Sequence, residues 1–158
     1  MIKKTITFHD FEGDKRTDDF YFSLNQVQFA KLNRLFPGGL QAYMEKIAKD
    51  KNVDELLRVI DILVSEAYGE RSGNAFVKVA PNGQKYADFF VNTEAYDNLL
   101  TELLQNNAYL IEFLTGCLPQ DAQVRARAGM AKFQEKLDQG ATPEEAMAEL
   151  QKEQAENT

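Results

Sequence analysis

Apolar and polar residues alternate at the start of the chain. Ile6 and Phe8 fall on one side of an extended segment, and Thr7 lies between them on the other side. This period of two is typical of a strand with one buried face. A glycine-containing turn over residues 10–14 leads to a second alternating run over residues 18–22. We therefore predict an N-terminal antiparallel β-hairpin, which must pack against helices because a lone hairpin is marginally stable in water.

After the hairpin the apolar spacing changes to three and four, the period of an amphipathic helix. Ser23 and Gln26 fit a capping box, in which each side chain bonds the other's backbone. Phe22 and Val27 then occupy the two positions of a hydrophobic staple. The first helix is predicted to end near Leu35, because the proline and glycines that follow favour a reversal. Further apolar stripes predict helices through residues 40–48, 53–67, 86–90, 96–104 and 110–114.

The boundaries of these helices have local signals of their own. Gly69 is a predicted helix stop, and residues 70–74 that follow it are predicted to form an exposed loop. A short strand is predicted over residues 75–80. The predicted N-caps, whose side chains can accept hydrogen bonds from the first helical turn, are Asn52, Thr93 and Asn106.

The apolar pattern weakens in the last part of the chain. Thr142 can cap a final helix, Pro143 suits its first position, and Glu145 completes a capping box. The last residues are polar and are predicted to fray. We predict a compact domain over residues 1–119 and a helical C-terminal extension with a frayed end over residues 120–158.

These elements together predict a mainly α fold of the α+β class. An N-terminal antiparallel β-hairpin packs on a multi-helix domain, and a helical tail follows it. Apolar positions in phase with the predicted strands and helices should form the core: Phe8, Phe22, Val27, Leu56, Leu57, Ile60, Leu63, Leu99, Leu103 and Leu114.

The charge is distributed unevenly along the chain. The formal net charge is −7, and the excess of acidic residues lies in the second half. No Lys or Arg occurs from Tyr86 to Val124, where six acidic residues fall. Such a surface repels nucleic-acid phosphates and can attract a basic partner, although an ordinary solvated helix face explains the same run. No apolar run has the length that a bilayer requires, so neither a membrane nor nucleic acid is an expected partner.

Residues that commonly carry chemistry are few and scattered. His9 is the only histidine and Cys117 the only cysteine, so a Cys–His dyad would require a long-range coincidence. The simpler interpretations are that His9 is exposed or stabilises a turn and that Cys117 is a buried thiol. Asp10, Glu12 and Asp14 alternate as in a calcium loop, but strands rather than helices flank them. We expect no catalytic residue, no metal and no cofactor.

A set of short motifs occurs in one order along the chain. Ile-Thr-Phe and an Asp-Phe-x-Gly turn come first, and the motifs at Thr17–Asn25, Pro37–Leu40, Ala67–Ser72, Thr93–Tyr96 and Gly116–Pro119 follow. The ordered set resembles the tail assembly chaperones of long-tailed siphophages. The resemblance covers residues 2–119, so the C-terminal extension lies outside it.

The resemblance implies a mostly helical, non-catalytic protein that binds the phage tape measure protein. It would keep this long helical chain soluble and help tail tube subunits polymerise around it. The expected partners are thus the tape measure protein, the tail tube protein and a second copy of the chain. The expected location is the host cytoplasm during assembly, with no copy in the mature virion. In such families a programmed ribosomal frameshift often yields a longer product with the same N-terminal domain.

Shielding an apolar helical client requires exposed apolar or amphipathic surface surrounded by charge. We predict that an apolar stripe contacts the client and that nearby acids select its basic residues. The stripe can instead serve only to close a helical hairpin in the tail. The candidate partner-binding residues are Met130, Phe133, Leu137, Met147 and Leu150 in the stripe, and Glu94, Asp97 and Glu102 among the acids.

Other classes of protein fit parts of this pattern. One alternative is a phage structural protein of the tail or of the head–tail connector that is retained in the virion. Others are an enzyme without a recognisable motif and a host regulatory adaptor that uses the same helical surface.

Overall fold

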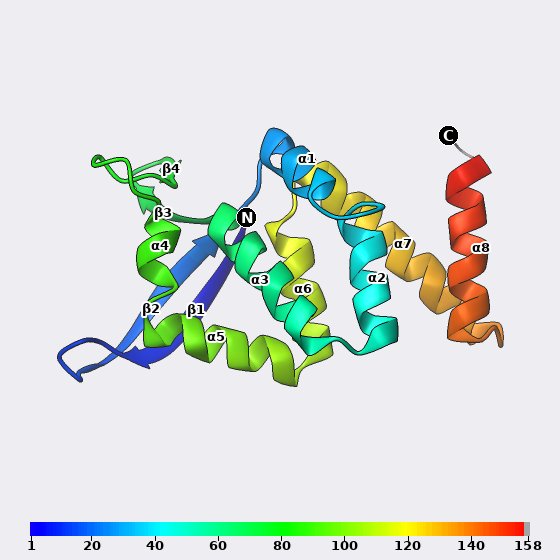
Figure 1. Cartoon of the computed structure of the whole chain (residues 1–158), viewed down its shortest axis with the longest axis horizontal. Helices are drawn as coiled ribbons and strands as arrows, with labels where there is room; N and C mark the ends of the chain where they lie inside the picture. Colours follow the sequence, from blue (N-terminus) through cyan, green and yellow to red (C-terminus); the bar gives the residue numbers. More distant parts are fainter. Residues whose placement is uncertain (157–158) are drawn as a thin grey trace. The chain divides into compact units, whose positions relative to one another are not determined.

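The computed structural model describes residues 1–156 (Figure 1). The chain divides into two compact units, Met1–Pro119 and Gln120–Thr158, each described here by itself. The first unit combines an antiparallel sheet with several helices, and the second is a pair of helices. The predicted α+β class with a dominant helical content is confirmed.

The sheet contains four antiparallel strands in the order β1-β2-β3-β4. The strands are β1 (Ile2–His9), β2 (Lys15–Phe22), β3 (Tyr68–Ser72) and β4 (Ala75–Val77). β1 and β2 pair along their full length, whereas β2 pairs with β3 only at Tyr21 and Phe22. The predicted N-terminal hairpin is therefore confirmed, and two further strands extend it.

The segment after the helix α3 (Val53–Ala67) differs from the prediction. Residues 70–74, expected to be a loop, include most of β3 and the turn to β4. Gly69 is no helix stop but a strand residue. A Cβ atom there would lie 2.7 Å from the Phe76 ring and 2.8 Å from the Val77 carbonyl oxygen, so the glycine permits close strand contact. The predicted strand over residues 75–80 is shorter, as β4 ends at Val77.

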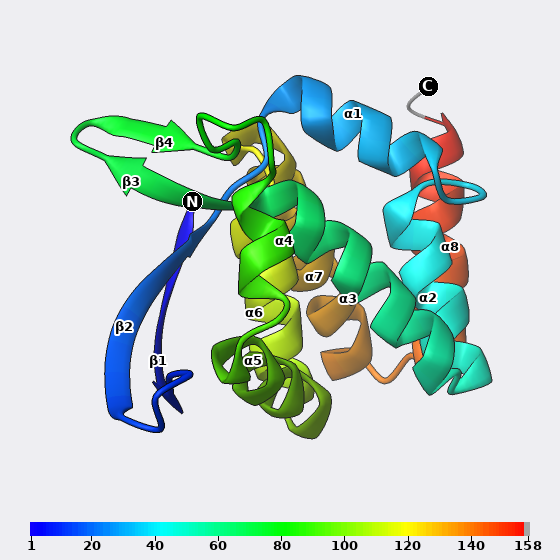
Figure 2. The ribbon, with the colours of Figure 1, turned by 60° about the vertical axis from the view of Figure 1, so that its left-hand side comes forward.

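Six helices complete the described first unit. They are α1 (Gln26–Arg34), α2 (Leu40–Asp50), α3 (Val53–Ala67), α4 (Tyr86–Phe90), α5 (Glu94–Gln105) and α6 (Asn107–Cys117). The predicted N-caps Asn52, Thr93 and Asn106 are confirmed, because each side chain accepts a backbone N–H of the first turn. Figure 2 shows α4, α5 and α6 beside the β1–β2 hairpin.

The start of α1 corrects a local prediction. The capping box is formed by Asn25 and Gln28 rather than by Ser23 and Gln26, with side-chain to backbone distances of 2.8 and 3.1 Å. Ser23 instead donates its backbone N–H to the Ala67 carbonyl at 2.9 Å, which keeps the chain extended past β2. The helix therefore starts later than predicted. Val27 is 63% exposed and forms neither a staple nor part of the core.

The core lies between the inner face of the sheet and the helices. Phe22 is fully buried and contacts Phe113 of α6 and Phe90 of α4, with ring centroids 5.0 and 5.7 Å apart. Tyr68 stacks on Phe90 at 4.4 Å, which joins β3 to the same cluster. Of the predicted core, Phe8, Phe22, Ile60, Leu63, Leu99 and Leu103 are buried, while Leu56, Leu57 and Leu114 are only half-buried.

The second unit is a helical hairpin of α7 (Gln120–Asp138) and α8 (Pro143–Glu156). The predicted capping box at the start of α8 is confirmed, since Thr142 and Glu145 exchange hydrogen bonds of 3.1 and 3.3 Å. Lys136 of α7 forms ion pairs with two glutamates of α8. The end that was predicted to fray is helical as far as Glu156, and residues 157–158 lie outside the described part.

Candidate partner-binding surfaces

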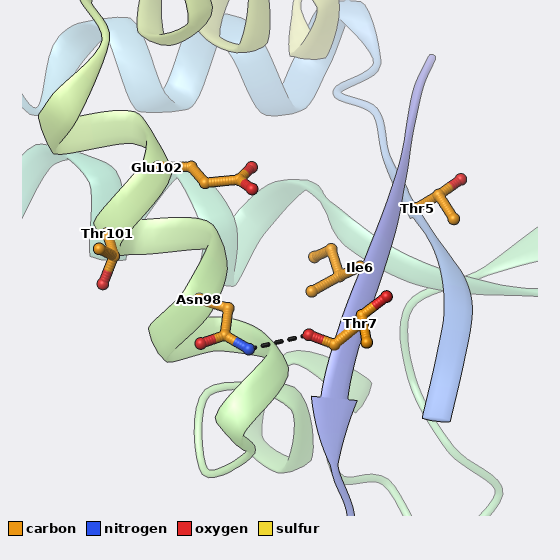
Figure 3. Close-up of a pocket in the computed structure, with 6 residues that line it drawn as sticks. All are labelled: Thr5, Ile6, Thr7, Asn98, Thr101 and Glu102. Atoms are coloured by element: carbon orange, nitrogen blue, oxygen red, sulfur yellow. Dashed lines mark hydrogen bonds between the residues drawn. The ribbon is translucent and has the colours of Figure 1, made fainter. Parts of the chain in front are cut away.

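A polar groove of about 360 Å³ lies between β1 and α5 in the first unit. Figure 3 shows its lining from both elements, with Ile6 directed toward α5. The groove is bordered by three consecutive strand residues and three helix residues: Thr5, Ile6, Thr7, Asn98, Thr101 and Glu102. Only Glu102 among them is ionisable, so the groove can attract a cation but has no group that would bind an anion strongly.

The alternation along β1 determines which strand groups reach the groove. Ile6 and Phe8 are buried against the helices. Thr5 and Thr7 carry their side chains on the opposite face, where their hydroxyls lie 2.6 Å from Asp19 and 2.8 Å from Thr17 of β2. At Thr7 the groove is therefore bordered by the backbone, and the Thr7 carbonyl oxygen points toward α5 (Figure 3).

Lys4 is the exception on the buried face of β1. Its side chain is directed inward, and its ammonium nitrogen lies 3.8 Å from the centroid of the Tyr109 ring. This cation–π contact allows the methylene chain to be buried while the charge keeps a favourable partner. The pKa of Tyr109 is raised to about 12, first by burial and then by the nearby Glu102 carboxylate.

α5 presents two chemically different faces. Its apolar face, with Leu99 and Leu103, is buried in the core. Its polar face carries Asn98, whose side-chain nitrogen donates a 2.9 Å hydrogen bond to the Thr7 carbonyl. Glu94, one turn earlier, lies 3.1 Å from the Nδ1 atom of His9. The helix is thus fixed to β1 at two points by exposed polar groups.

The three predicted acids differ in their surroundings. The hydrogen bond from His9 holds the pKa of Glu94 below its usual value. Because both partners are about half-exposed, this pair contributes little to stability. Asp97 is exposed, and Glu102 borders the groove. All three lie on α5, and the sequence gives no Lys or Arg on α5 or α6 to neutralise them.

The apolar stripe lies in the second unit. Met130 is 40% exposed on α7, and the other four members are half-buried. Phe133 and Leu137 belong to α7, whereas Met147 and Leu150 belong to α8. The structure thus places the five apolar residues on one helical hairpin and the three acids on a helix of the other unit.

A family model described as "Phage tail assembly chaperone" matches residues 1–158. The chain belongs to this family. The match includes residues 120–158, which the sequence resemblance left out, so the two-helix unit lies within the family's extent. No curated protein and no solved structure gives a match.

Three further findings on the described part of this tail assembly chaperone concern metal ligands, membrane-spanning helices and the single thiol. Within residues 1–156, no group of three His, Cys, Asp or Glu residues is placed to hold a metal ion. No described helix is long and apolar enough to cross a membrane. Cys117 is buried as expected from the sequence, and burial raises the pKa of its thiol to about 12. That thiol is therefore un-ionised and unreactive at neutral pH.

Sequence reasoning missed most of the groove of this chaperone. Asn98 and Thr101 were not singled out, nor was Thr5 as a border of a site. Their signal was present in part, since polar residues of α5 recur at helical spacing opposite its leucines. What was missing is that α5 packs against β1, a contact between residues as far apart as Thr7 and Asn98.

Proposed function

We propose that this chain binds the tape measure protein of its phage, keeps that long chain soluble, and promotes polymerisation of the tail tube around it. The observation that carries the proposal is the family match over the full length of the chain. A tail assembly chaperone needs a client that would otherwise aggregate. The resemblance of residues 2–119 to siphophage tail chaperones points to the tape measure protein as that client.

The helical hairpin α7–α8 supplies the apolar part of the proposed contact. Met130 is the most exposed member of the stripe. The other four members are half-buried, and the parts of their side chains that remain exposed can contact a client. An amphipathic client helix buries its apolar face against such a surface. The same side chains also help to close the hairpin, so substitutions must separate the two roles.

The acids on α5 supply the electrostatic part. Glu94, Asp97 and Glu102 are exposed carboxylates on a helix without basic residues. They would favour basic segments of the client and keep copies of the chaperone apart, because like charges repel. Charge of this kind contributes more to the association rate and to selectivity than to affinity.

We infer that the chain acts by binding alone, in the host cytoplasm while tails assemble, and leaves before the virion is complete. A tail or connector subunit would instead remain in the particle at fixed stoichiometry. Mass spectrometry of purified virions distinguishes these roles. The chaperone is expected to be absent, and its presence in a constant ratio to tail proteins would favour the structural role.

The direct test is coexpression of the tape measure protein with and without the full chain, with the soluble fraction as the measurement. The wild-type chain should raise this fraction, and Met130→Asp should lower it. Val124→Asp is the matched control, because Val124 is also exposed and lies on α7 outside the stripe. A tape measure protein that stays equally insoluble with the wild-type chain would overturn the proposal.

A further inference from the structure

The β1 strand forms one edge of the sheet, and β4 forms the other. β4 has three residues, which makes it a poor template for another strand. β1 has eight residues, contains no proline, and pairs in unbroken register with β2 on its other side. The long edge of β1 is therefore the place where this sheet could accept a further strand.

The phase of the β1–β2 ladder determines which backbone groups face outward. The backbone N–H of Asp10 donates to the Asp14 carbonyl at 3.0 Å, which makes this a hydrogen-bonded pair. Hydrogen-bonded and non-hydrogen-bonded pairs alternate along an antiparallel ladder. The even-numbered residues of β1 therefore bond to β2, and the odd-numbered residues direct their N–H and C=O groups away from it.

Two contacts with α5 agree with this phase. Asn98 bonds the outward carbonyl of Thr7, and Glu94 accepts a hydrogen bond from the His9 backbone. α5 thus covers the edge at the C-terminal end of β1. In the described part of the chain, no such contact from α5 reaches the outward groups of Lys3 and Thr5. Thr5 borders the groove, and Lys3 lies two residues before it on β1.

We propose that an extended segment of the client pairs with the β1 edge at Lys3 and Thr5, with a Lys or Arg side chain beside Glu102. Backbone pairing supplies affinity in strand addition, and alternate side chains supply specificity. Side chains on the inner side of the added strand would meet the groove wall formed by Asn98, Thr101 and Glu102. Because Glu102 is the one charged residue of that lining, a cation is the complementary group.

The basic residues of β1 do not conflict with this cationic partner. Lys4 is buried, and its ammonium group is held over the Tyr109 ring. Lys3 lies on the opposite face of the sheet, where its ammonium group is 3.4 Å from Asp19. The inference rests on the proposed function only in taking the tape measure protein as the client.

Amide hydrogen exchange distinguishes the two classes of β1 residues. The chain is exchanged alone and in complex with tape measure protein, then read residue by residue by NMR after transfer to an aprotic solvent. In the free chain, Lys3 and Thr5 should exchange fast and Lys4 and Ile6 slowly, because only the latter bond to β2. In the complex, exchange of Lys3 and Thr5 should slow by about tenfold or more. A complex in which these amides still exchange as in the free chain would overturn the inference.

Substitutions test the same geometry by affinity. Thr5→Pro removes an outward N–H without removing a bond to β2, since proline is tolerated on edge strands with this orientation. Thr5→Val is the matched control, because it keeps the N–H and loses only the hydroxyl contact with Asp19. Affinity for the tape measure protein should fall about tenfold in Thr5→Pro and stay near wild type in Thr5→Val.

A second pair of variants covers the case in which proline disturbs the hairpin. Glu102→Lys should weaken binding, whereas Glu112→Lys on the exposed side of α6 should not. Equal binding by both variants would contradict the cationic contact. If the wild-type chain forms no complex at all, the proposed function fails first. If the Lys3 and Thr5 amides are protected from exchange in the chain alone at high concentration, a second copy of the chain occupies the β1 edge. That result would overturn the assignment of this edge to the client.

Discussion

The ammonium group of Lys78 donates a hydrogen bond to the backbone carbonyl of Glu66, 2.7 Å away at the end of α3. The same nitrogen donates to the Ser23 carbonyl at 2.5 Å and to the Gln28 side chain at 2.6 Å. One lysine after β4 thus joins the end of α3 to the connection between β2 and α1. The backbone carbonyls of Ser23 and Glu66 lie where the sheet meets the helices. Removal of the Lys78 ammonium group would take away a hydrogen-bond donor from both.

Lys78→Met should lower the free energy of unfolding by about 1–3 kcal/mol, because it leaves part-buried carbonyls without a donor. Lys85→Met is the matched control. Lys85 forms an ion pair with the Glu66 side chain at 2.7 Å, but both side chains are about 40% exposed. Its loss should cost less than about 1 kcal/mol. Urea unfolding followed by circular dichroism measures the free energy of unfolding of both variants. Equal losses would show that the Lys78 hydrogen bonds stabilise the chain no more than the exposed Lys85 ion pair does.

The pH dependence of stability reports the same lysine. Burial lowers the pKa of Lys78 to about 8 from its usual 10.5. The unfolded chain therefore holds more protons at this position between these values, so the lysine's contribution to unfolding free energy rises with pH there. Cys117 acts in the opposite direction above pH 9, since burial raises its pKa to about 12.

The useful comparison is thus the stability difference between wild type and Lys78→Met at about pH 7.5 to 9, in which the effect of Cys117, present in both chains, cancels. The free energy of unfolding of the wild type should rise with pH relative to that of Lys78→Met, so the stability difference between the two chains should widen across this interval. A difference that stays constant across this interval would mean that the Lys78 amine does not titrate in it. The measurement is a series of urea unfolding curves at closely spaced pH values.

Leu103→Ala should destabilise the chain by about 2–5 kcal/mol, because Leu103 is fully buried and its loss leaves a cavity. The sequence pattern assigned Leu57 to the same core, but that side chain is only half-buried near the start of α3. Leu57→Ala should therefore cost clearly less than Leu103→Ala. Chemical unfolding of both variants ranks them, and a larger loss at Leu57 would contradict the helix phase in the structure.

Local signals predicted most of the helix starts correctly. Asn52, Thr93 and Asn106 each cap the helix that follows, because capping depends on residues within one turn. The start of α1 was wrong because two overlapping capping boxes fit the sequence. Backbone bonds from Ser23 to Ala67 and from Leu24 to Cys117 favour the later one, and no local pattern contains those partners.

Non-local pairing accounts for what the sequence did not reveal. β3 is short and polar, and its place in the sheet depends on two residue pairs with β2. The groove likewise depends on α5 packing against β1, which appears in the sequence only as two unrelated segments. The acids of the candidate surface could be found from composition, whereas the backbone edge beside them required the register of the hairpin.

Gly69→Ala should destabilise the first unit by about 1–3 kcal/mol, because a methyl group at this position would overlap the Phe76 ring and the Val77 carbonyl. The Phe76 ring could turn away, but the Val77 carbonyl is backbone, so the strands β3 and β4 must separate to relieve the overlap. Gly129→Ala provides the opposite case. Gly129 lies within α7 with open space around it, and alanine there should stabilise the helix by about 0.5–1 kcal/mol. Thermal unfolding monitored by circular dichroism, with NMR amide spectra to assign the affected unit, should show opposite shifts for the two substitutions. A neutral Gly69→Ala would mean that the β3–β4 hairpin does not pack as closely as its backbone contacts indicate.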